Sequence, residues 1–357
     1  MKLFSKTLVA LATSMSLMVA GASSVNAEEK KEFKLAWSIY VGWMPWGWAA
    51  DQGIVDKWAD KYDIEIAVVQ FNDYIESINQ YTAGAFDGVT ATNMDTLAIP
   101  SVGGVDTTAL IVGDFSNGND ALILKGADSL DAVLGQNVNL VELSVSHYLL
   151  ARALETLGKA EKDVTVVNTS DADMIAAYQT DDVTAVVTWN PLVAEILEVP
   201  GANKVFDSSD IPGEIMDLTV VNTDTLADNP AFGKALAGAW YETMSIMLSD
   251  TPEGAAARAA MGEASGTDLA GYDMQLASTQ MFANAADAVT FTTSDSVTST
   301  MESVRTFLFE RGLLGEGASS PDIVGIAFPD GSVLGDEGNV KFRFNADYMS
   351  MAADGSL

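Results

Sequence analysis

Aromatic side chains that could face a small ligand are concentrated in one short stretch. Five of the seven tryptophans fall within "WSIYVGWMPWGWAADQGIVDKW", residues 37–58. Tyr40, Trp43 and Trp46 surround a Gly/Pro turn that follows a predicted strand over 33–38. Loops positioned by rigid strands carry function, so these three rings are candidates for lining a ligand site. The alternative is that the turn only packs the edge of a domain.

The other tryptophans divide between core and site. Trp48 and Trp58 stand at helix-compatible positions, which favours a place in the core. Trp37 ends the first strand and could point either way. Trp189 ends a predicted strand over 184–189 and is therefore a candidate for the opposite wall of the same site.

Carboxylates follow the predicted strands in the same way. With fifty Asp and Glu in the chain, a solvated charge or a turn cap competes with a ligand role for any single one. Their joint occurrence at strand ends is what favours a binding site. The polar candidates are Asp95, Asp114, Asp120, Glu142 and Asp217, together with Asn93 and Asn190.

Aromatic rings beside carboxylates suit a cation. Ring faces attract cations by about 0.5 to 2 kcal/mol per well-placed contact. Carboxylates accept paired N–H bonds, so a planar cation with several N–H donors would match both groups. The pattern therefore favours a guanidine-like solute first and a urea-like solute second.

An anion site remains the alternative, and it would need basic residues or a helix N-terminus. The arginines after the first 27 residues lie within or after predicted helices, not at strand ends. What remains is "SVSH", residues 144–147, at the start of a predicted helix. Ser144 could bind an anion or simply cap the helix. His147, the only histidine, could touch a ligand or face solvent.

Signals of an enzyme are absent from the sequence. With no Cys and one His, neither a Cys–His pair nor a histidine-based metal cluster can form. There is no G-x-S-x-G, no Walker A motif and no G-x-G-x-x-G after a strand. We therefore predict a binding protein without catalytic residues, metal or cofactor.

The N-terminus and the charge set the compartment and the partners. Residues 1–27 combine a basic start, an apolar run and a small-x-small end, which predicts a signal peptide and a periplasmic protein. The chain has 18 Lys and Arg against 50 Asp and Glu, a net charge of −32. This acidity argues against nucleic acid as a partner and is also explained by a surface adapted to salt.

The elements that position these residues alternate in type. Short β-type runs alternate with helical patterns, which indicates α/β units with parallel sheets. Predicted strands cover 33–38, 63–71, 86–92, 107–113, 137–143, 163–168 and 184–189. Predicted helices cover 45–53, 73–84, 146–157, 171–179, 230–249, 252–264 and 295–312, with one more from Pro191. The turn-rich segment 316–340 fits neither pattern.

Two α/β units separated by irregular crossings near 113–120 and 207–217 predict two lobes with a cleft. Lobe 1 is discontinuous, 28–119 plus 213–357, and lobe 2 is 120–212. Open α/β sheets bind ligands outside the carboxyl ends of their strands. The expected cleft segments are 38–46, 92–95, 114–120, 142–147, 189–190 and Asp217.

"GWMPWGWAADQGIVDKWADKYDIEI" resembles the opening of ABC-transporter solute-binding proteins of the nitrate/taurine/sulfonate type. The stretches "WSIYVGWMPWGW", "ATNMD", "GDFSNGNDAL", "VELSVSHYLLARALETLG" and "TWNPL" are similar to a subgroup associated with urea carboxylase, with urea- or guanidine-related uptake. The resemblance covers most of residues 33–250.

This resemblance implies a type II periplasmic-binding-protein fold that closes on a small solute and delivers it to the transmembrane subunits of a permease. The expected protein is a monomer. Capture of taurine, a sulfonate or nitrate is the alternative that the wider family implies. Pyrimidine-precursor synthases share the fold, but they are intracellular and rely on His and Cys residues that this chain lacks.

Overall fold

The computed structural model describes residues 30–315 and 317–357. The predicted signal peptide, residues 1–27, lies outside the described residues. Both sheets belong to one compact unit, Lys31–Leu357. Within the described residues, no helix is both long enough and apolar enough to cross a bilayer.

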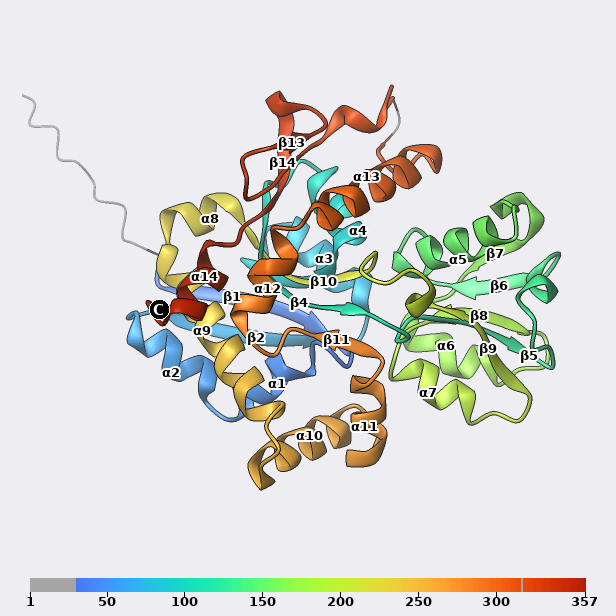
Figure 1. Ribbon diagram of the computed structural model, residues 1–357, viewed down its shortest axis with the longest axis horizontal. Coiled ribbons are helices and arrows are strands. Elements are labelled where there is room, and N and C mark those ends of the chain that lie inside the picture. Colours follow the sequence, from blue (N-terminus) through green and yellow to red (C-terminus); the bar gives the residue numbers. More distant parts are fainter. Residues whose placement is uncertain (1–29, 316) are drawn as a thin grey trace, which may run out of the picture. The chain divides into compact units, whose positions relative to one another are not determined.

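A nine-stranded sheet organises the larger part of the chain (Figure 1). The strand order is β13-β12-β14-β4-β10-β3-β1-β2, and β11 pairs with β4. Strand β4 carries the apolar run ALIVG at residues 109–113 and is buried except at Phe115, as expected for a central strand. The strands are β1 (Glu32–Ser38), β2 (Glu65–Phe71), β3 (Gly88–Thr92), β4 (Thr107–Ser116), β10 (Met216–Asn222), β11 (Thr279–Met281), β12 (Gly325–Ala327), β13 (Val333–Leu334) and β14 (Val340–Phe344).

Helices from both ends of the chain accompany this sheet (Figure 1). Asp73 caps α3 and Thr92 caps α4, each through a side-chain oxygen that accepts a backbone N–H. The helices are α1 (Met44–Asp51), α2 (Ile54–Lys61), α3 (Tyr74–Thr82), α4 (Asn93–Thr96), α8 (Thr223–Asp228), α9 (Pro230–Met247), α10 (Pro252–Ala264), α11 (Leu269–Leu276), α12 (Ala285–Thr292), α13 (Asp295–Glu310) and α14 (Asp347–Asp354).

A second, five-stranded sheet has the order β7-β6-β8-β5-β9. Figure 1 shows α5 over one face of this sheet and α6 and α7 over the other. The strands are β5 (Ala121–Lys125), β6 (Asn137–Leu140), β7 (Thr165–Asn168), β8 (Ala185–Thr188) and β9 (Ala202–Asp207). The helices are α5 (Val145–Thr156), α6 (Asp171–Tyr178) and α7 (Leu192–Leu197).

The prediction of parallel sheets is correct only in part. β1 pairs in parallel with β2 and β3, but β10 lies antiparallel between β3 and β4. In the second sheet β5 is antiparallel to both β8 and β9. The reason is that β5 and β10 are the strands by which the chain passes from one sheet to the other, so each fills a place between strands of opposite direction.

The two crossings that the sequence predicts as irregular consist partly of β-strand. β4 continues to Ser116, and β10 begins at Met216, so both crossing segments end in paired strand. Their pairing sets Asp217 opposite Asp114. The unassigned segment 316–340 contains the short strands β12 and β13. The sequence patterns also missed β9, β14, α2, α11, α12 and α14.

Trp58 packs helix α2 against helix α9, which confirms its predicted core role. Its ring lies over Gly238, where a Cβ would come within 2.2 Å of the indole carbon Cε3. The indole Nε1 donates to Glu242 one turn further along α9, at 2.6 Å. Glycine at 238 therefore creates the slot that lets the two helices meet.

We expect Gly238→Ala to destabilise the protein by about 1–3 kcal/mol, because the methyl group displaces the Trp58 ring from a packed interface. This loss should exceed the gain of about 1 kcal/mol in helix propensity. Urea unfolding of both proteins measures the difference. Gly338→Ala, at an exposed position, is the matched control, and an unchanged or higher free energy of unfolding for Gly238→Ala would contradict the packing role.

Candidate functional site: a buried pocket of aromatic rings and carboxyl groups

A small pocket lies where the two sheets meet. Its cavity volume is only about 10 Å³, roughly the space that one water molecule needs. A larger solute therefore requires the lining residues to move apart. The pocket is lined by Tyr40, Trp43, Tyr74, Thr92, Asp120, Val145, Trp189 and Asp217, and we call it the central pocket.

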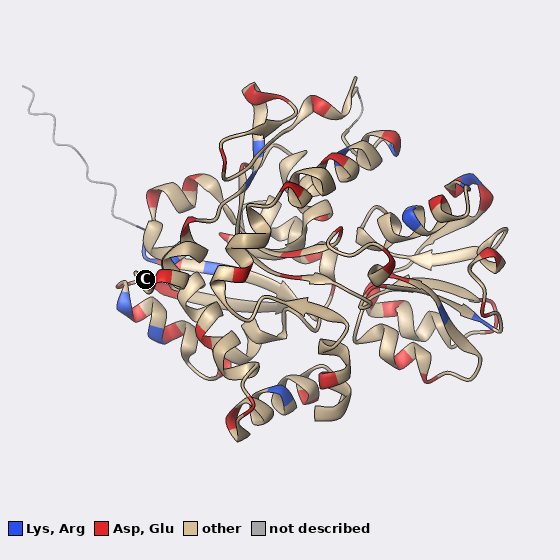
Figure 2. Ribbon diagram, viewed as in Figure 1, with Lys and Arg blue, Asp and Glu red and all other residues tan. Residues whose placement is uncertain are grey.

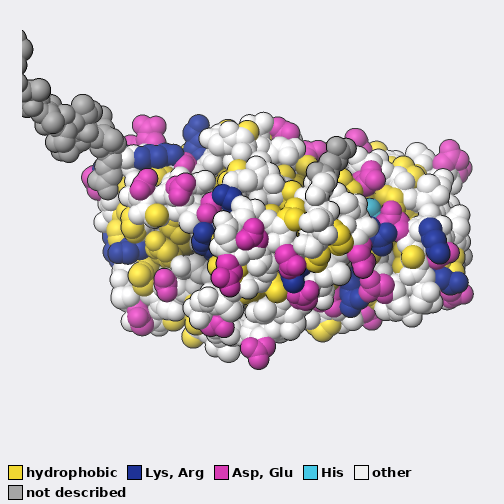
Figure 3. Space-filling view, turned by 90° about the horizontal axis from the view of Figure 1, so that it is seen from above, with side chains coloured by type: hydrophobic (Ala, Val, Ile, Leu, Met, Phe, Trp, Pro, Cys, Tyr) yellow, Lys and Arg dark blue, Asp and Glu magenta, His cyan; other side chains and the backbone are white. Residues whose placement is uncertain are grey.

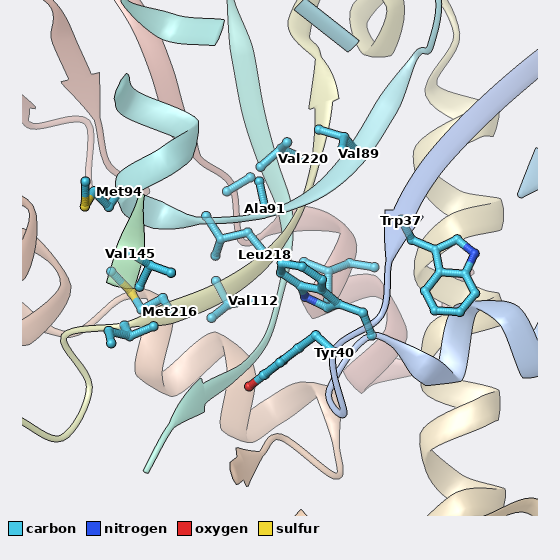
Figure 4. Close-up of a cluster of buried hydrophobic side chains, with 14 of the residues drawn as sticks. Trp37, Tyr40, Val89, Ala91, Met94, Val112, Val145, Met216, Leu218 and Val220 are labelled. Atoms are coloured by element: carbon cyan, nitrogen blue, oxygen red, sulfur yellow. The ribbon is translucent and has the colours of Figure 1, made fainter. Parts of the chain in front are cut away.

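Strand ends from both sheets build the central pocket. Tyr40 follows β1 and Thr92 ends β3, while Trp189 follows β8 and Asp120 precedes β5. Ligand sites outside the carboxyl ends of strands are expected for open α/β sheets. Figure 4 shows Tyr40 and Val145 among the core residues around β4 and β10.

Four aromatic rings form a continuous wall. The Tyr40 and Trp43 rings lie 4.9 Å apart, edge to face. Trp43 lies 5.5 Å from Tyr74, whose ring is in turn 5.6 Å from that of Trp189. The indole Nε1 of Trp189 donates to the Ile39 carbonyl at 3.4 Å, so the wall joins elements of both sheets.

Asp95 is wholly buried beside this wall. Its Oδ2 accepts hydrogen bonds from the Tyr74 hydroxyl at 2.7 Å and the Thr92 hydroxyl at 2.9 Å. Its Oδ1 is buried and has no partner among the described residues. Burial raises the pKa of Asp95 to about 6. A carboxylate oxygen without a donor is costly to bury, and Asp95 lies behind the residues that line the central pocket rather than among them.

Asp114 and Asp217 form a second carboxyl cluster on the paired strands β4 and β10. Tyr40 donates its hydroxyl to Asp114 Oδ1 at 2.9 Å. Asp114 Oδ2 and Asp217 Oδ2 are both buried without a donor among the described residues. Burial raises the pKa of each group, and for Asp217 the neighbouring Asp114 and Asp120 charges raise it further.

Asp120 is the fourth buried carboxyl group. Only 3% of its surface is exposed, and the Ser116 hydroxyl donates to its Oδ2 at 2.6 Å. Burial raises its pKa to about 7, and the charge of Asp95 adds to the effect. Figure 2 shows acidic residues where the strands run from one sheet to the other.

Basic side chains are absent from the lining of the central pocket, and the arginines are paired elsewhere. No Lys, Arg or His is among the residues that line the central pocket. Each arginine beyond residue 30 forms an ion pair with an acidic residue. The pairs are Arg152–Glu214, Arg258–Asp273, Arg305–Glu302, Arg311–Glu161 and Arg343–Asp106. Figure 3 shows further acidic side chains spread over one outer face.

The N-terminus of α5 is the candidate anion site. Two of its backbone N–H groups already donate hydrogen bonds to other residues of the protein. Ser144 caps the helix by accepting the Ser146 N–H at 3.2 Å. The backbone N–H of Val145 donates to Asp95 Oδ2 at 3.4 Å. A carboxylate therefore lies where an external anion would have to bind.

His147 is held away from the central pocket. Its Nδ1 accepts the Leu143 N–H at 3.2 Å, and its Nε2 lies 2.9 Å from Glu161. Because Nδ1 is an acceptor, the proton of the neutral ring is on Nε2 and points at Glu161. The arrangement orients His147 structurally and leaves it outside the ring of lining residues.

Asp95, Asp114 and Ser144 also lie outside the lining, and so do four other candidates from the sequence. Trp46 is buried in α1, where its Nε1 donates to Thr219 at 3.1 Å and its ring packs on Trp240. Asn93 binds the backbone of Glu214 and Met216, and Asn190 accepts from the Ala194 N–H. Glu142 is exposed and borders a separate groove with Asp73 and Asp171.

Tyr74 is the lining residue that the predicted cleft segments omitted. It begins α3 directly after β2, so the strand-end rule would have found it if applied to that strand. The helical periodicity of its neighbours indicates a helix and carries no information about the direction of the Tyr74 hydroxyl. Its two hydrogen bonds, to Asp95 and from the Thr92 N–H at 3.0 Å, tie the two parts of the site together.

Comparison with known proteins places the chain. A model of the NMT1-like family matches residues 26–262. The taurine-binding periplasmic protein of Escherichia coli K12 is 28% identical over 132 residues, which span 36% of this chain and 40% of that protein. The chain therefore matches less than half of that relative's length.

Solved structures share the fold. The alkanesulfonate-binding protein of Xanthomonas axonopodis, bound to MOPS, superposes with a TM-score of 0.66 at 15% identity, covering 81% of this chain and 96% of that one. The periplasmic aliphatic sulphonate binding protein of E. coli gives 0.65 at 16% identity, covering 80% and 94%. The predicted α/β, two-lobed periplasmic-binding-protein fold is confirmed.

The raised pKa of Asp120 makes the stability of the empty protein depend on pH. Between the ordinary value near 4 and about 7, the folded state binds more protons than the unfolded state. The free energy of unfolding therefore falls as pH rises through this window. We expect the decrease in Tm from pH 5 to pH 8 to be about 5 °C smaller in Asp120→Asn than in wild type.

Thermal unfolding of the ligand-free proteins at pH 5, 6, 7 and 8 tests this expectation. Asp250→Asn, which alters an exposed carboxylate, should keep the wild-type profile. If Asp120→Asn and wild type have identical pH profiles, burial does not raise the pKa of Asp120 in the folded protein.

Proposed function

This chain belongs to the NMT1-like family, and from that premise we propose that it is the periplasmic solute-binding component of an ABC importer. The fold shared with sulfonate-binding proteins and the name of the E. coli relative support a role in binding rather than catalysis. In this proposal the lobes are 28–119 plus 213–357 and 120–212, and they close on the solute at the central pocket before docking to permease subunits.

We further propose that the solute is a small cation of the guanidine type. The observation that carries this proposal is a set of three buried carboxyl oxygens without donors, Asp95 Oδ1, Asp114 Oδ2 and Asp217 Oδ2. A buried acceptor without a donor costs free energy that a ligand can recover. Guanidinium offers N–H donors around a flat perimeter, so it can meet several carboxyl groups at once.

Charge and shape favour the same solute. A buried cation is costly unless it is paired, and the pocket supplies carboxyl groups rather than competing basic residues. The ring faces of Trp43 and Trp189 add an attraction of about 0.5–2 kcal/mol per well-placed contact. The small volume favours an unsubstituted planar solute over one that carries a long side chain.

A urea-like solute is the second candidate. Trp43 Nε1 is a buried donor without a partner among the described residues. The carbonyl oxygen of urea could accept from it, whereas guanidinium has no acceptor. Urea is neutral, however, and would leave the carboxylates without a counter-charge.

Taurine and sulfonates are the alternative that the names of the relatives raise, and the sequence resemblance adds nitrate. For these anions the lining of the central pocket offers two acidic groups, Asp120 and Asp217, and the start of α5 faces Asp95. We therefore expect the family fold to be used here with the opposite charge preference.

Calorimetric titration of the protein without residues 1–27 tests the proposal directly. We expect guanidinium to bind, urea to bind more weakly, and taurine and nitrate to give no heat. Asp95→Asn should weaken guanidinium binding by at least about 30-fold, because it removes one partner of a buried charge pair. Asp250→Asn is the matched surface control. Binding of taurine or nitrate without guanidinium would overturn the proposal.

Gly42 offers a steric test of where the solute sits. A Cβ at this position would come 2.6 Å from Asp114 Oδ2 and 2.5 Å from Tyr40 Cε1. The φ of Gly42 lies outside the left-handed region, so the backbone itself tolerates alanine. We expect Gly42→Ala to weaken guanidinium binding at least about tenfold by crowding this carboxyl oxygen.

The same titration, with Gly338→Ala as control, measures the effect. Near-ultraviolet circular dichroism should confirm that Gly42→Ala keeps its tertiary structure. If a folded Gly42→Ala protein binds guanidinium with unchanged affinity, the solute does not bind against Asp114.

A further inference from the structure

We propose that the Asp114–Asp217 pair holds one proton while the central pocket is empty and releases it when a cationic solute binds. Solute capture is then an exchange of cation for proton. This inference rests on the proposed function and extends it to how the site distinguishes a charged solute from a neutral one.

The geometry of the two strands brings the pair together. Asp114 on β4 and Asp217 on β10 are register partners in an antiparallel ladder. Both side chains are buried, and they lie within hydrogen-bonding reach of each other. If both were ionised, neither could donate, and each would keep an Oδ2 without a partner. One proton between them gives the pair a hydrogen bond and halves its charge.

The surroundings favour keeping that proton. The ionisable groups that act on the pair are Tyr40 from the turn after β1, Asp120 before β5, and Tyr272 from α11. Tyr40 donates to Asp114, and Tyr272 donates to the Val41 carbonyl at 2.9 Å, so neither supplies positive charge. Arg258, beyond Tyr272, is engaged with Asp273 at 2.7 Å.

Burial and negative neighbours therefore both act against a second ionisation. Burial is the first cause of the raised pKa of Asp217, and the Asp114 and Asp120 charges follow. Two carboxyl groups that share one buried site behave as a coupled pair with one strongly held proton.

A cation changes this balance. Guanidinium brings the positive charge and the N–H donors that the proton had supplied, so the pair can ionise fully. The exchange balances as protonated pair plus guanidinium giving doubly ionised pair with guanidinium, plus one proton released to solvent. Urea brings donors without charge, so it leaves the proton in place. The protonation state of the pair thus depends on the charge of the solute.

Calorimetry at pH 8 in buffers of different ionisation enthalpy counts the protons. At this pH Asp95 and Asp120, with pKa values of about 6 and about 7, are largely ionised and contribute little. We expect release of about one proton per guanidinium in wild type and in Asp250→Asn, and close to none in Asp217→Asn. Guanidinium binding without proton release overturns the inference and leaves the proposed function standing.

Infrared spectroscopy tests the shared proton without a ligand. Ligand-free protein at pH 8 should show the C=O absorption of a protonated carboxyl group, and this band should be lost in Asp217→Asn and in Asp114→Asn but kept in Asp120→Asn. Two variants of the pair guard against one that fails to fold. Absence of the band in wild type overturns the inference. A protein that shows the band but binds no guanidinium overturns the proposed function and the exchange with it.

Discussion

The burial of four carboxyl groups without a basic partner is the constraint on which this structure depends. Asp95, Asp114, Asp120 and Asp217 lie where the two sheets meet, and at most 3% of any of them is exposed. Isolated buried charges are unfavourable, so the fold must supply donors, hold protons or receive a cation. The hydroxyl groups of Tyr40, Tyr74 and Ser116 supply donors for three of the four.

The crossing strands explain how the carboxyl groups come together. β4 leaves the large sheet at Ser116 and β10 returns to it at Met216, so acids far apart in sequence become neighbours. The aromatic wall closes the same space from both sheets, through Tyr74 on one side and Trp189 on the other. Binding chemistry and the connection between lobes therefore use the same few residues, which is why the solute and lobe closure are coupled in the proposed mechanism.

The sequence located residues that line the central pocket better than it indicated side-chain directions. Strand ends located Tyr40, Trp43, Asp120, Trp189 and Asp217, because strand boundaries follow from local hydrophobic patterns. Side-chain direction at those ends depends on packing with distant segments. Glu142 turns to solvent, and His147 turns to Glu161, for reasons that no local pattern contains. The antiparallel placement of β5 and β10 was missed for the same reason, since a strand's neighbours are set by the whole chain.

In the proposed function, Asp95 of α4, which lies against the start of α5, reverses the charge preference of the fold without changing its architecture. The first turn of a helix is an electropositive feature of the backbone that no side-chain substitution removes. Here the Asp95 carboxylate, from another part of the chain, neutralises the start of α5 through its Oδ2. Its Oδ1 has no donor among the described residues. The protein carries, in effect, a built-in counter-ion. One acidic side chain at this junction could separate cation carriers from anion carriers among chains whose backbones superpose.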